Sequence, residues 1–467
     1  MNNFNGIRLL MTLSLILAQL SSAQAQKPGY KGLVLPDHAH FPVSQDRLLV
    51  IRDSQDVDKM REHAWSIFAG LTNSSVRSTV PIWESWYTKC DVKIATPAYC
   101  PSPADHSKDF LRNLEIPVQS LHQFLDLKGM LESLQSDQKT ERFLDDWETP
   151  PQFAGVLYNY EAAQHILKKH LYSVPRLDGL RNAIANANAK KYVPPTRIPN
   201  FPRASIVVKT EWQVVYDLGH GQTTPLFIWD PDVAKRRRSA GNYDSMNVQD
   251  WGKTVVIDTS GRACDDRDYQ DGEAVPLDCF YSRSLPGPDL DATSGEVQGI
   301  IERDKPANAG TPYLILMGVH LTTKEIPDWV WATFWWYNRV SESPYSADRP
   351  ARLVGKWRHF LMDTTFSDTT PLDPVDGKNK ICYNPYLEER FSGGIVSNCI
   401  QCHKRAVYGA KEDGYKFAEE ARGVDPKTIS KDDPYFNGVV RVDFLWSVSA
   451  PQDLNPFMLT LRQFLVK

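Results

Sequence analysis

The first part of the chain has a helical pattern of apolar positions. Between residue 53 and residue 187, apolar side chains recur at three- and four-residue intervals in four stretches, which is the periodicity of amphipathic helices. The positions are Val57, Met60, Ala64, Ile67 and Leu71; Phe124, Leu127, Leu131 and Leu134; Ala162 and Ile166; and Leu177, Leu180 and Ile184. An Asp53/Ser54 cap is expected to begin the first helix. We therefore predict a mainly helical region over residues 26–200.

The pattern changes after a connector that contains Pro194, Pro195, Pro199 and Pro202. From Ile206 to Tyr216 apolar and polar residues alternate, which predicts a half-buried strand. Further strands are expected at Leu226–Trp229, Thr254–Asp258, Tyr313–Thr323, Trp329–Tyr337 and Trp357–Phe366. Polar, turn-rich loops separate them. Residues 201–370 are therefore predicted to form an antiparallel β domain, a sandwich or a curled sheet, and the whole chain belongs to the α+β class.

The N-terminus has the pattern of an export signal. Arg8 precedes a mostly apolar run from Leu9 to Leu20, and Ala23-Gln24-Ala25 forms a small-residue cleavage site. The run is about a dozen residues long, too short to cross a bilayer. Residues 1–25 are therefore predicted to be a signal peptide. We expect a soluble exported protein, periplasmic or otherwise outside the cytoplasm, without a membrane span.

Composition is that of an ordinary globular protein. The chain has 467 residues, of which 42% are hydrophobic and 24% charged, and its formal net charge is −4. The basic run from Lys235 to Arg238 stands alone in a slightly acidic sequence and is interpreted as a solvated loop. Nucleic acid is therefore not an expected partner.

A second connector leads into a C-terminal segment, residues 371–467, which contains Cys399-Ile400-Gln401-Cys402-His403. Two thiols three positions apart can add to the two vinyl groups of a haem, and the histidine that follows can bind its iron. A zinc or dithiol motif with an incidental histidine is the alternative. Zinc would need a second ligand pair at comparable spacing, and the sequence has none. One covalent haem c is therefore the expected cofactor.

Five cysteines remain outside this motif. In an oxidising compartment Cys90 pairs plausibly with Cys100, and Cys264 with Cys279, because each pair would close a short loop. Cys382 is then left over, either as a buried thiol or as a neighbour of the haem. Sequence alone does not determine this connectivity.

The pentapeptide resembles the attachment motif of c-type cytochromes. The resemblance implies that Cys399 and Cys402 are thioether anchors and that His403 is the proximal iron ligand. In that family a methionine before the last helix completes the iron, and Met458 has this placement. Gly438–Ser447 departs from the pattern, since it is strand-like where the family has helices. The combination of Trp329–Phe334, Asn384–Glu388 and a haem motif near the end of the chain also resembles a group of exported monohaem proteins. This resemblance covers roughly the last half of the chain and implies no activity.

The sixth iron ligand would decide what the haem does. Met458 is one candidate on spacing, and His320 in the expected strand Tyr313–Thr323 is another. Regular alternation would place His320 with Leu314, Leu316 and Gly318 on one face, and Met317 on the other. Other histidines, such as His359, or no protein ligand remain open.

Three functions are compatible with this sequence. The first is electron transfer with a redox partner protein, since a second strong ligand favours outer-sphere transfer. The second is a haem enzyme of peroxidase or oxygenase type, with an open distal site between the β domain and the haem segment. The third is a haem-based sensor or binding module. The chain has no recognisable nucleophile triad or phosphate loop, so we favour the redox protein.

Overall fold

The computed structural model describes eleven parts of the chain: residues 33–73, 80–94, 100, 109–115, 152–187, 197–230, 252–371, 381–388, 398–409, 430 and 433–449. Four sequence predictions lie outside these residues. They are the signal peptide, the helix around Phe124 to Leu134, the basic run at Lys235–Arg238 and Met458.

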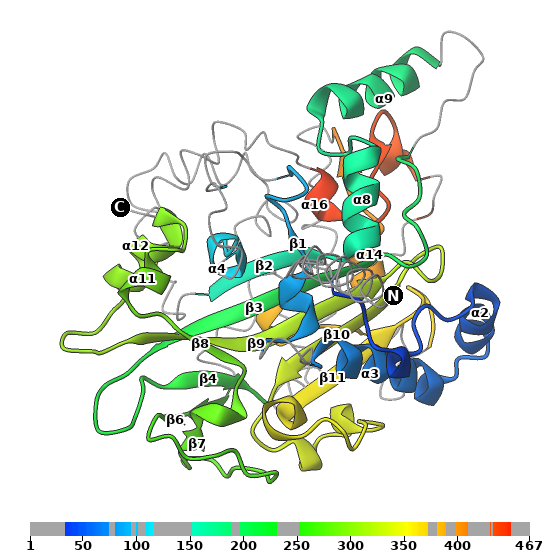
Figure 1. Ribbon diagram of the computed structural model, residues 1–467. Helices are drawn as coiled ribbons and strands as arrows, with labels where there is room; N and C mark the ends of the chain where they lie inside the picture. The colour runs from blue at the N-terminus through cyan, green and yellow to red at the C-terminus, as the bar shows by residue number, and fades with distance from the viewer. Residues whose placement is uncertain are drawn as a thin grey trace, which may run out of the picture.

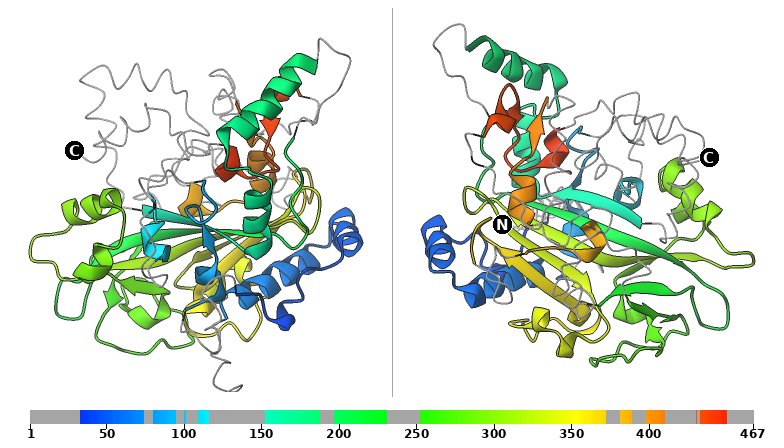
Figure 2. Two further views of the ribbon diagram at one scale, coloured as in Figure 1. Left: turned by 45° about the horizontal axis from the view of Figure 1, so that its top comes forward. Right: turned by 180° about the vertical axis from the view of Figure 1, so that it is seen from behind.

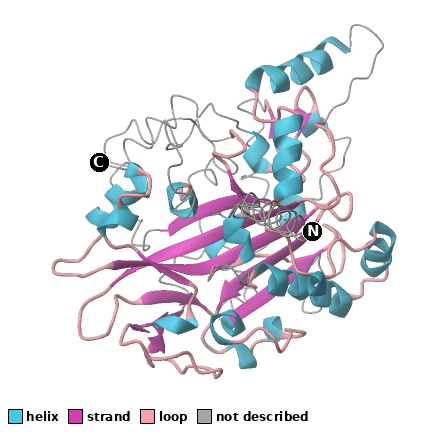
Figure 3. Cartoon of the chain, in the orientation of Figure 1, coloured by secondary structure: helices cyan, strands magenta, loops and turns pink. Residues whose placement is uncertain are grey.

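An antiparallel sheet of seven strands forms the centre of the molecule (Figures 1 and 3). Its order is β1-β2-β3-β9-β10-β11, and β8 pairs with β9 outside this path. The strands are β1 (Tyr87–Thr88), β2 (Gln152–Tyr158), β3 (Ile206–Tyr216), β8 (Ser282–Ser284), β9 (Pro312–Thr323), β10 (Val330–Trp336) and β11 (Phe360–Thr365). Helices accompany this sheet, so the fold class is α+β, as predicted.

Helices near the N-terminus cover one face of this sheet (Figure 1). They are α2 (Gln45–Asp53), α3 (Val57–Leu71), the 3-10 turn η2 (Ile82–Ser85) and α4 (Asp109–Arg112). Phe68 of α3 stacks on Phe334 of β10, with ring centroids 4.0 Å apart. The expected Asp53/Ser54 cap is wrong: these residues end α2, and the carboxylate of Asp56 caps α3 by accepting the N–H of Lys59. A separate short helix precedes α3 because Ser44 provides a cap of its own.

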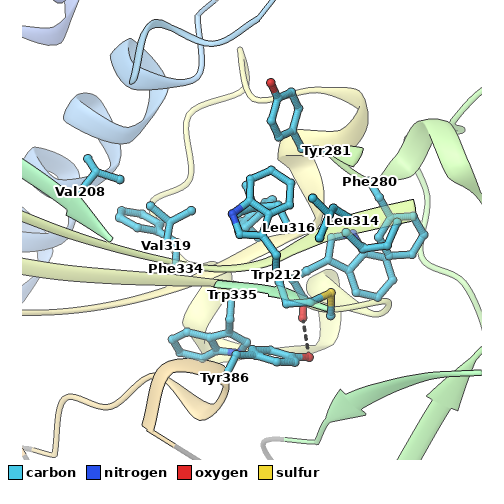
Figure 4. Close-up of a cluster of buried hydrophobic side chains, with 14 of the residues drawn as sticks. Val208, Trp212, Phe280, Tyr281, Leu314, Leu316, Val319, Phe334, Trp335 and Tyr386 are labelled. Atoms are coloured by element: carbon cyan, nitrogen blue, oxygen red, sulfur yellow. Dashed lines mark hydrogen bonds between the residues drawn. The ribbon is translucent and has the colours of Figure 1, made fainter. Parts of the chain in front are cut away.

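Figure 4 shows buried side chains on both faces of the sheet. Val208, Trp212 and Leu316 lie on the face that these helices cover, while Trp335 and Tyr386 lie on the opposite face. This second face carries α8 (Tyr160–Lys168), α9 (Val174–Ala187), α13 (Pro385–Glu388), α14 (Cys399–His403), α16 (Trp446–Ser449) and the strand pair β12 (Val407–Tyr408) and β13 (Val440–Arg441). Of these elements, α16, β12 and β13 lie beside α8 and α9 at one end of the sheet (Figure 2).

Two small sheets and several short helices complete the described part. β4 (Leu226–Trp229) pairs with β5 (Gly252–Val255), and β6 (Ile257–Asp258) pairs with β7 (Val275–Pro276). The main sheet is thus open, and two of its strands, β1 and β2, come from the region that was predicted to be mainly helical. The remaining helices are η1 (Asp37–Ala39), η6 (Leu277–Cys279), α11 (Gly287–Leu290), α12 (Gly295–Arg303), η7 (Val340–Glu342), η8 (Pro344–Ser346), η9 (Gly355–His359) and η12 (Pro434–Phe436).

Both expected disulfides are present, Cys90–Cys100 and Cys264–Cys279. Several strand predictions need correction, and one strand was missed. The predicted strand Thr254–Asp258 is divided between β5 and β6, which belong to different sheets. Residues 357–359 belong to η9 rather than to β11, and only Val440–Arg441 of the strand-like stretch 438–447 is a strand. β2 was not predicted, although it lies at the heart of the sheet.

Candidate functional site

The motif Cys399–His403 forms the short helix α14. Its N-cap is Asn398, whose side-chain oxygen accepts the N–H of Ile400 at 2.9 Å. The amide nitrogen of Asn398 also donates to the hydroxyl of Thr365, at the end of β11. In a helix, residues three and four apart share a face, so Cys399, Cys402 and His403 lie on one side of α14. The cap thus anchors the motif to the sheet.

The imidazole of His403 has a fixed orientation. Its Nδ1 lies 2.8 Å from the carbonyl oxygen of Phe444. A carbonyl only accepts, so Nδ1 carries the proton and Nε2 keeps its lone pair, which is the state that binds a metal. The pKa of His403 is lowered to about 4. Burial is the main cause and the charge of Lys209 adds to it, while the hydrogen bond to Phe444 acts in the opposite direction. His403 is therefore neutral at physiological pH.

His320 faces this imidazole from β9. The ring centroids of His320 and His403 lie 5.6 Å apart, and the ring planes differ by 19°. His320 is buried, and neither ring nitrogen has a hydrogen-bond partner in the part of the chain that the structure describes. Its pKa lies well below the ordinary value because burial, His403 and Lys209 all disfavour a proton. Of the candidate partners for His403, the structure thus brings His320 to it.

The alternation expected for this strand is wrong on one point. Gly318 pairs with Glu211, but Leu316 pairs with Trp212, so the register shifts between them and leaves Met317 as an extra residue. A β-bulge of this kind turns the following residues to the other face. Leu314 and Leu316 therefore lie on the face opposite His320, with Trp212. The local periodicity of β9 cannot reveal this bulge, because a bulge is defined by the pairing with the partner strand, here β3.

Trp331 of β10 completes the immediate surroundings of the two histidines. Its ring centroid is 4.1 Å from that of His403 and 5.4 Å from that of His320. The indole N–H donates to the carbonyl of Asp328, which holds the ring in place. Trp335 and Trp336 of the same strand pack in the hydrophobic core. Trp331 additionally contacts the site.

Three buried thiols lie at or beside α14. Cys382, Cys399 and Cys402 are outside the two disulfides. The Sγ atom of Cys382 is 3.4 Å from that of Cys399, and residue 382 pairs with residue 398 through a parallel bridge. The leftover cysteine, Cys382, is therefore a direct neighbour of Cys399, which the sequence alone could not determine.

A different Cys-Cys-His group lies elsewhere. Among the described residues, the one set of three or more metal-ligand side chains within 4.8 Å of one another is Cys264, Cys279 and His359. The two cysteines form a disulfide, and His359 Nε2 lies 3.6 Å from Cys264 Sγ. His359, an open candidate for the iron, therefore contacts this disulfide. Among the described residues, Cys399, Cys402 and His403 do not form a second group of this kind.

Comparisons with family models, curated proteins and solved structures found no match to this chain. No helix in the described part of the chain is long and apolar enough to cross a membrane.

Proposed function

We propose that this chain is an exported, periplasmic monohaem c-type protein that acts in electron transfer with a redox partner. Cys399 and Cys402 would be the thioether anchors, and His403 the proximal ligand. The observation that carries the proposal is the pair of neutral imidazoles, one fixed by a backbone carbonyl and the other without partners among the described residues. Haem iron supplies a one-electron couple when such a site holds it.

The side chains of this site fit a covalent haem in three respects. The thiols of Cys399 and Cys402 are one helical turn apart and outside any described disulfide. The Nδ1–H of His403 is taken by Phe444, so only Nε2 is offered to a metal. Trp331 and the apolar residues around α14 pack against the imidazoles, of which His320 is buried and His403 partly buried. Ligand orientation and apolar surroundings both tune a haem iron.

His320 is the proposed second ligand, in preference to Met458. A buried imidazole without hydrogen bonds loses the hydration of both nitrogens, a cost of about 1–3 kcal/mol for each unsatisfied group. Coordination of iron by one nitrogen would offset that cost. Two strong axial ligands favour electron transfer over chemistry at the iron.

The covalent attachment can be tested with the mature protein, produced with a haem-attachment system. A haem stain after denaturing electrophoresis should mark the wild type. Cys402→Ala and Cys399→Ala should each lose most of the stain, and the double variant all of it. Cys382→Ala is the matched control, because it removes a buried thiol next to Cys399 and keeps both cysteines of the motif. Full stain in the double variant would contradict the proposed anchors.

Carbon monoxide separates electron transfer from the haem-enzyme alternative. The optical spectrum of the ferrous wild type should stay unchanged for many minutes after carbon monoxide is added, because His320 would occupy the sixth position. His320→Ala should respond within seconds, and the exposed His170→Ala should behave as the wild type. A rapid response of the wild type would mean an open iron and would favour a peroxidase- or oxygenase-type enzyme or a gas sensor.

A further inference from the structure

Lys209 differs from the other lysines that the fold partly or fully buries. Four described lysines with little exposed surface each reach a carboxylate within 4.0 Å; the pairs are Lys89–Glu115, Lys253–Asp230, Lys324–Asp443 and Lys404–Asp368. Lys209 is partly buried in the middle of β3, yet it has no ion pair or side-chain hydrogen bond with any residue that the structure describes. Its charge therefore lacks the partner that buried charges usually have.

The position of Lys209 places this charge at the histidine pair. Lys209 is directly opposite His320 across β3 and β9, and Thr333 of β10 is opposite His320 on its other side. Opposite residues lie on the same face of a sheet. Two neutral imidazoles cannot compensate its charge.

We infer that Lys209 is the cation of a carboxylate-binding site beside the His320–His403 pair. The next residue on the same face of β3 is Glu211, which is buried. Its proximity opposes an anion with two charges, such as phosphate, and leaves a single carboxylate as the favoured occupant. The carboxylate is either a propionate of the haem, in which case the inference rests on the proposed function, or a small free carboxylate.

The first test uses haem-loaded Lys209→Gln and Lys209→Arg proteins. Removing a positive charge near the iron makes the reduced form less favourable. Lys209→Gln should change the ratio of oxidised to reduced protein at a fixed potential by at least tenfold, which is about 59 mV lower midpoint potential for a one-electron couple. Lys209→Arg keeps the positive charge, so its midpoint potential should stay close to that of the wild type.

Formate, added at constant ionic strength, identifies the source of the carboxylate. If a propionate is the partner, formate leaves the wild-type spectrum unchanged and only the midpoint potential of Lys209→Gln shifts. If a free carboxylate is bound, the wild-type spectrum changes saturably, and Lys209→Gln needs at least tenfold more formate. A Lys209→Gln protein with wild-type potential and wild-type formate response would overturn the inference.

Failure of the proposed function would be visible separately. If the wild type carries no covalent haem, thermal unfolding of the full chain tests instead whether Lys209 binds a carboxylate. Formate should then raise the Tm of the wild type and of Lys209→Arg, but not that of Lys209→Gln. An equal response, or no response, of all three proteins would overturn the carboxylate site.

Discussion

At the scale of single residues, a buried ion pair supports the loop that orients His403. Lys324 donates to Asp443 at 2.6 Å, and both side chains are almost fully buried. The same carboxylate accepts the N–H of Phe201. Asp443 and Phe444 both have positive φ, 49° and 70°, a conformation that non-glycine residues adopt only when their surroundings stabilise it. The carbonyl that fixes His403 therefore depends on a neighbouring charge pair.

Breaking this pair should destabilise the protein strongly. Lys324→Met leaves the Asp443 carboxylate buried without its cation, and such a change costs about 3–5 kcal/mol. The double variant Lys324→Met/Asp443→Asn should recover a large part of the lost free energy of unfolding. It leaves no unpaired charge, and the side-chain oxygen of asparagine can still accept the N–H of Phe201. Urea unfolding at neutral pH gives the free energies. A loss of less than about 1 kcal/mol in Lys324→Met would show that the pair does not hold this loop.

At the scale of an element, the bulge in β9 allows His320 to face the motif helix. Next to the bulge, Gly318 packs against the side chain of Asn384: an added Cβ would lie 3.2 Å from its oxygen and 3.4 Å from its nitrogen. Asn384 caps α13 through the N–H of Tyr386, and it donates to Thr333. Gly318 therefore gives Asn384 room to join α13 to β10.

Gly318→Ala should lower the free energy of unfolding by about 1–3 kcal/mol, because the extra methyl group forces Asn384 out of its hydrogen bonds. Gly179→Ala is the control. Gly179 lies in α9, is exposed and has nothing within 4 Å of an added Cβ, so alanine should be neutral or stabilise by up to about 1 kcal/mol. Equal effects of the two substitutions in urea unfolding would contradict the packing argument.

At the scale of the whole molecule, sequence and structure agree where the signal is local. Alternation predicted β3 and β9 closely, and short loops predicted both disulfides. The motif of α14 is contiguous, so it was visible at once. The pairing of His320 with His403 was not, because it depends on how β9 and the motif helix meet through β10 and β11. The sequence did not single out Lys209 for the same reason. Its position opposite His320 becomes visible only when β3 is paired with β9.

His359 links the stability of the whole molecule to pH. This histidine is fully buried beside the Cys264–Cys279 disulfide, and burial, followed by the charge of Arg358, lowers its pKa from 6.5 to about 4. As the pH falls, the unfolded chain therefore takes up a proton before the folded protein does. The neutral histidine stabilises the fold fully above pH 6.5, and this contribution is lost as the pH falls through about 4.

A His359→Gln variant should reveal this contribution, since glutamine does not titrate. Its free energy of unfolding should fall below that of the wild type at about pH 7.5, and the difference should shrink by up to about 3 kcal/mol on acidification through about pH 4. Urea unfolding across this range measures both proteins, with the exposed His38→Gln as control. A difference that stays constant with pH would mean that the pKa of His359 is the same in the folded and the unfolded protein, so that burial does not disfavour its charged form.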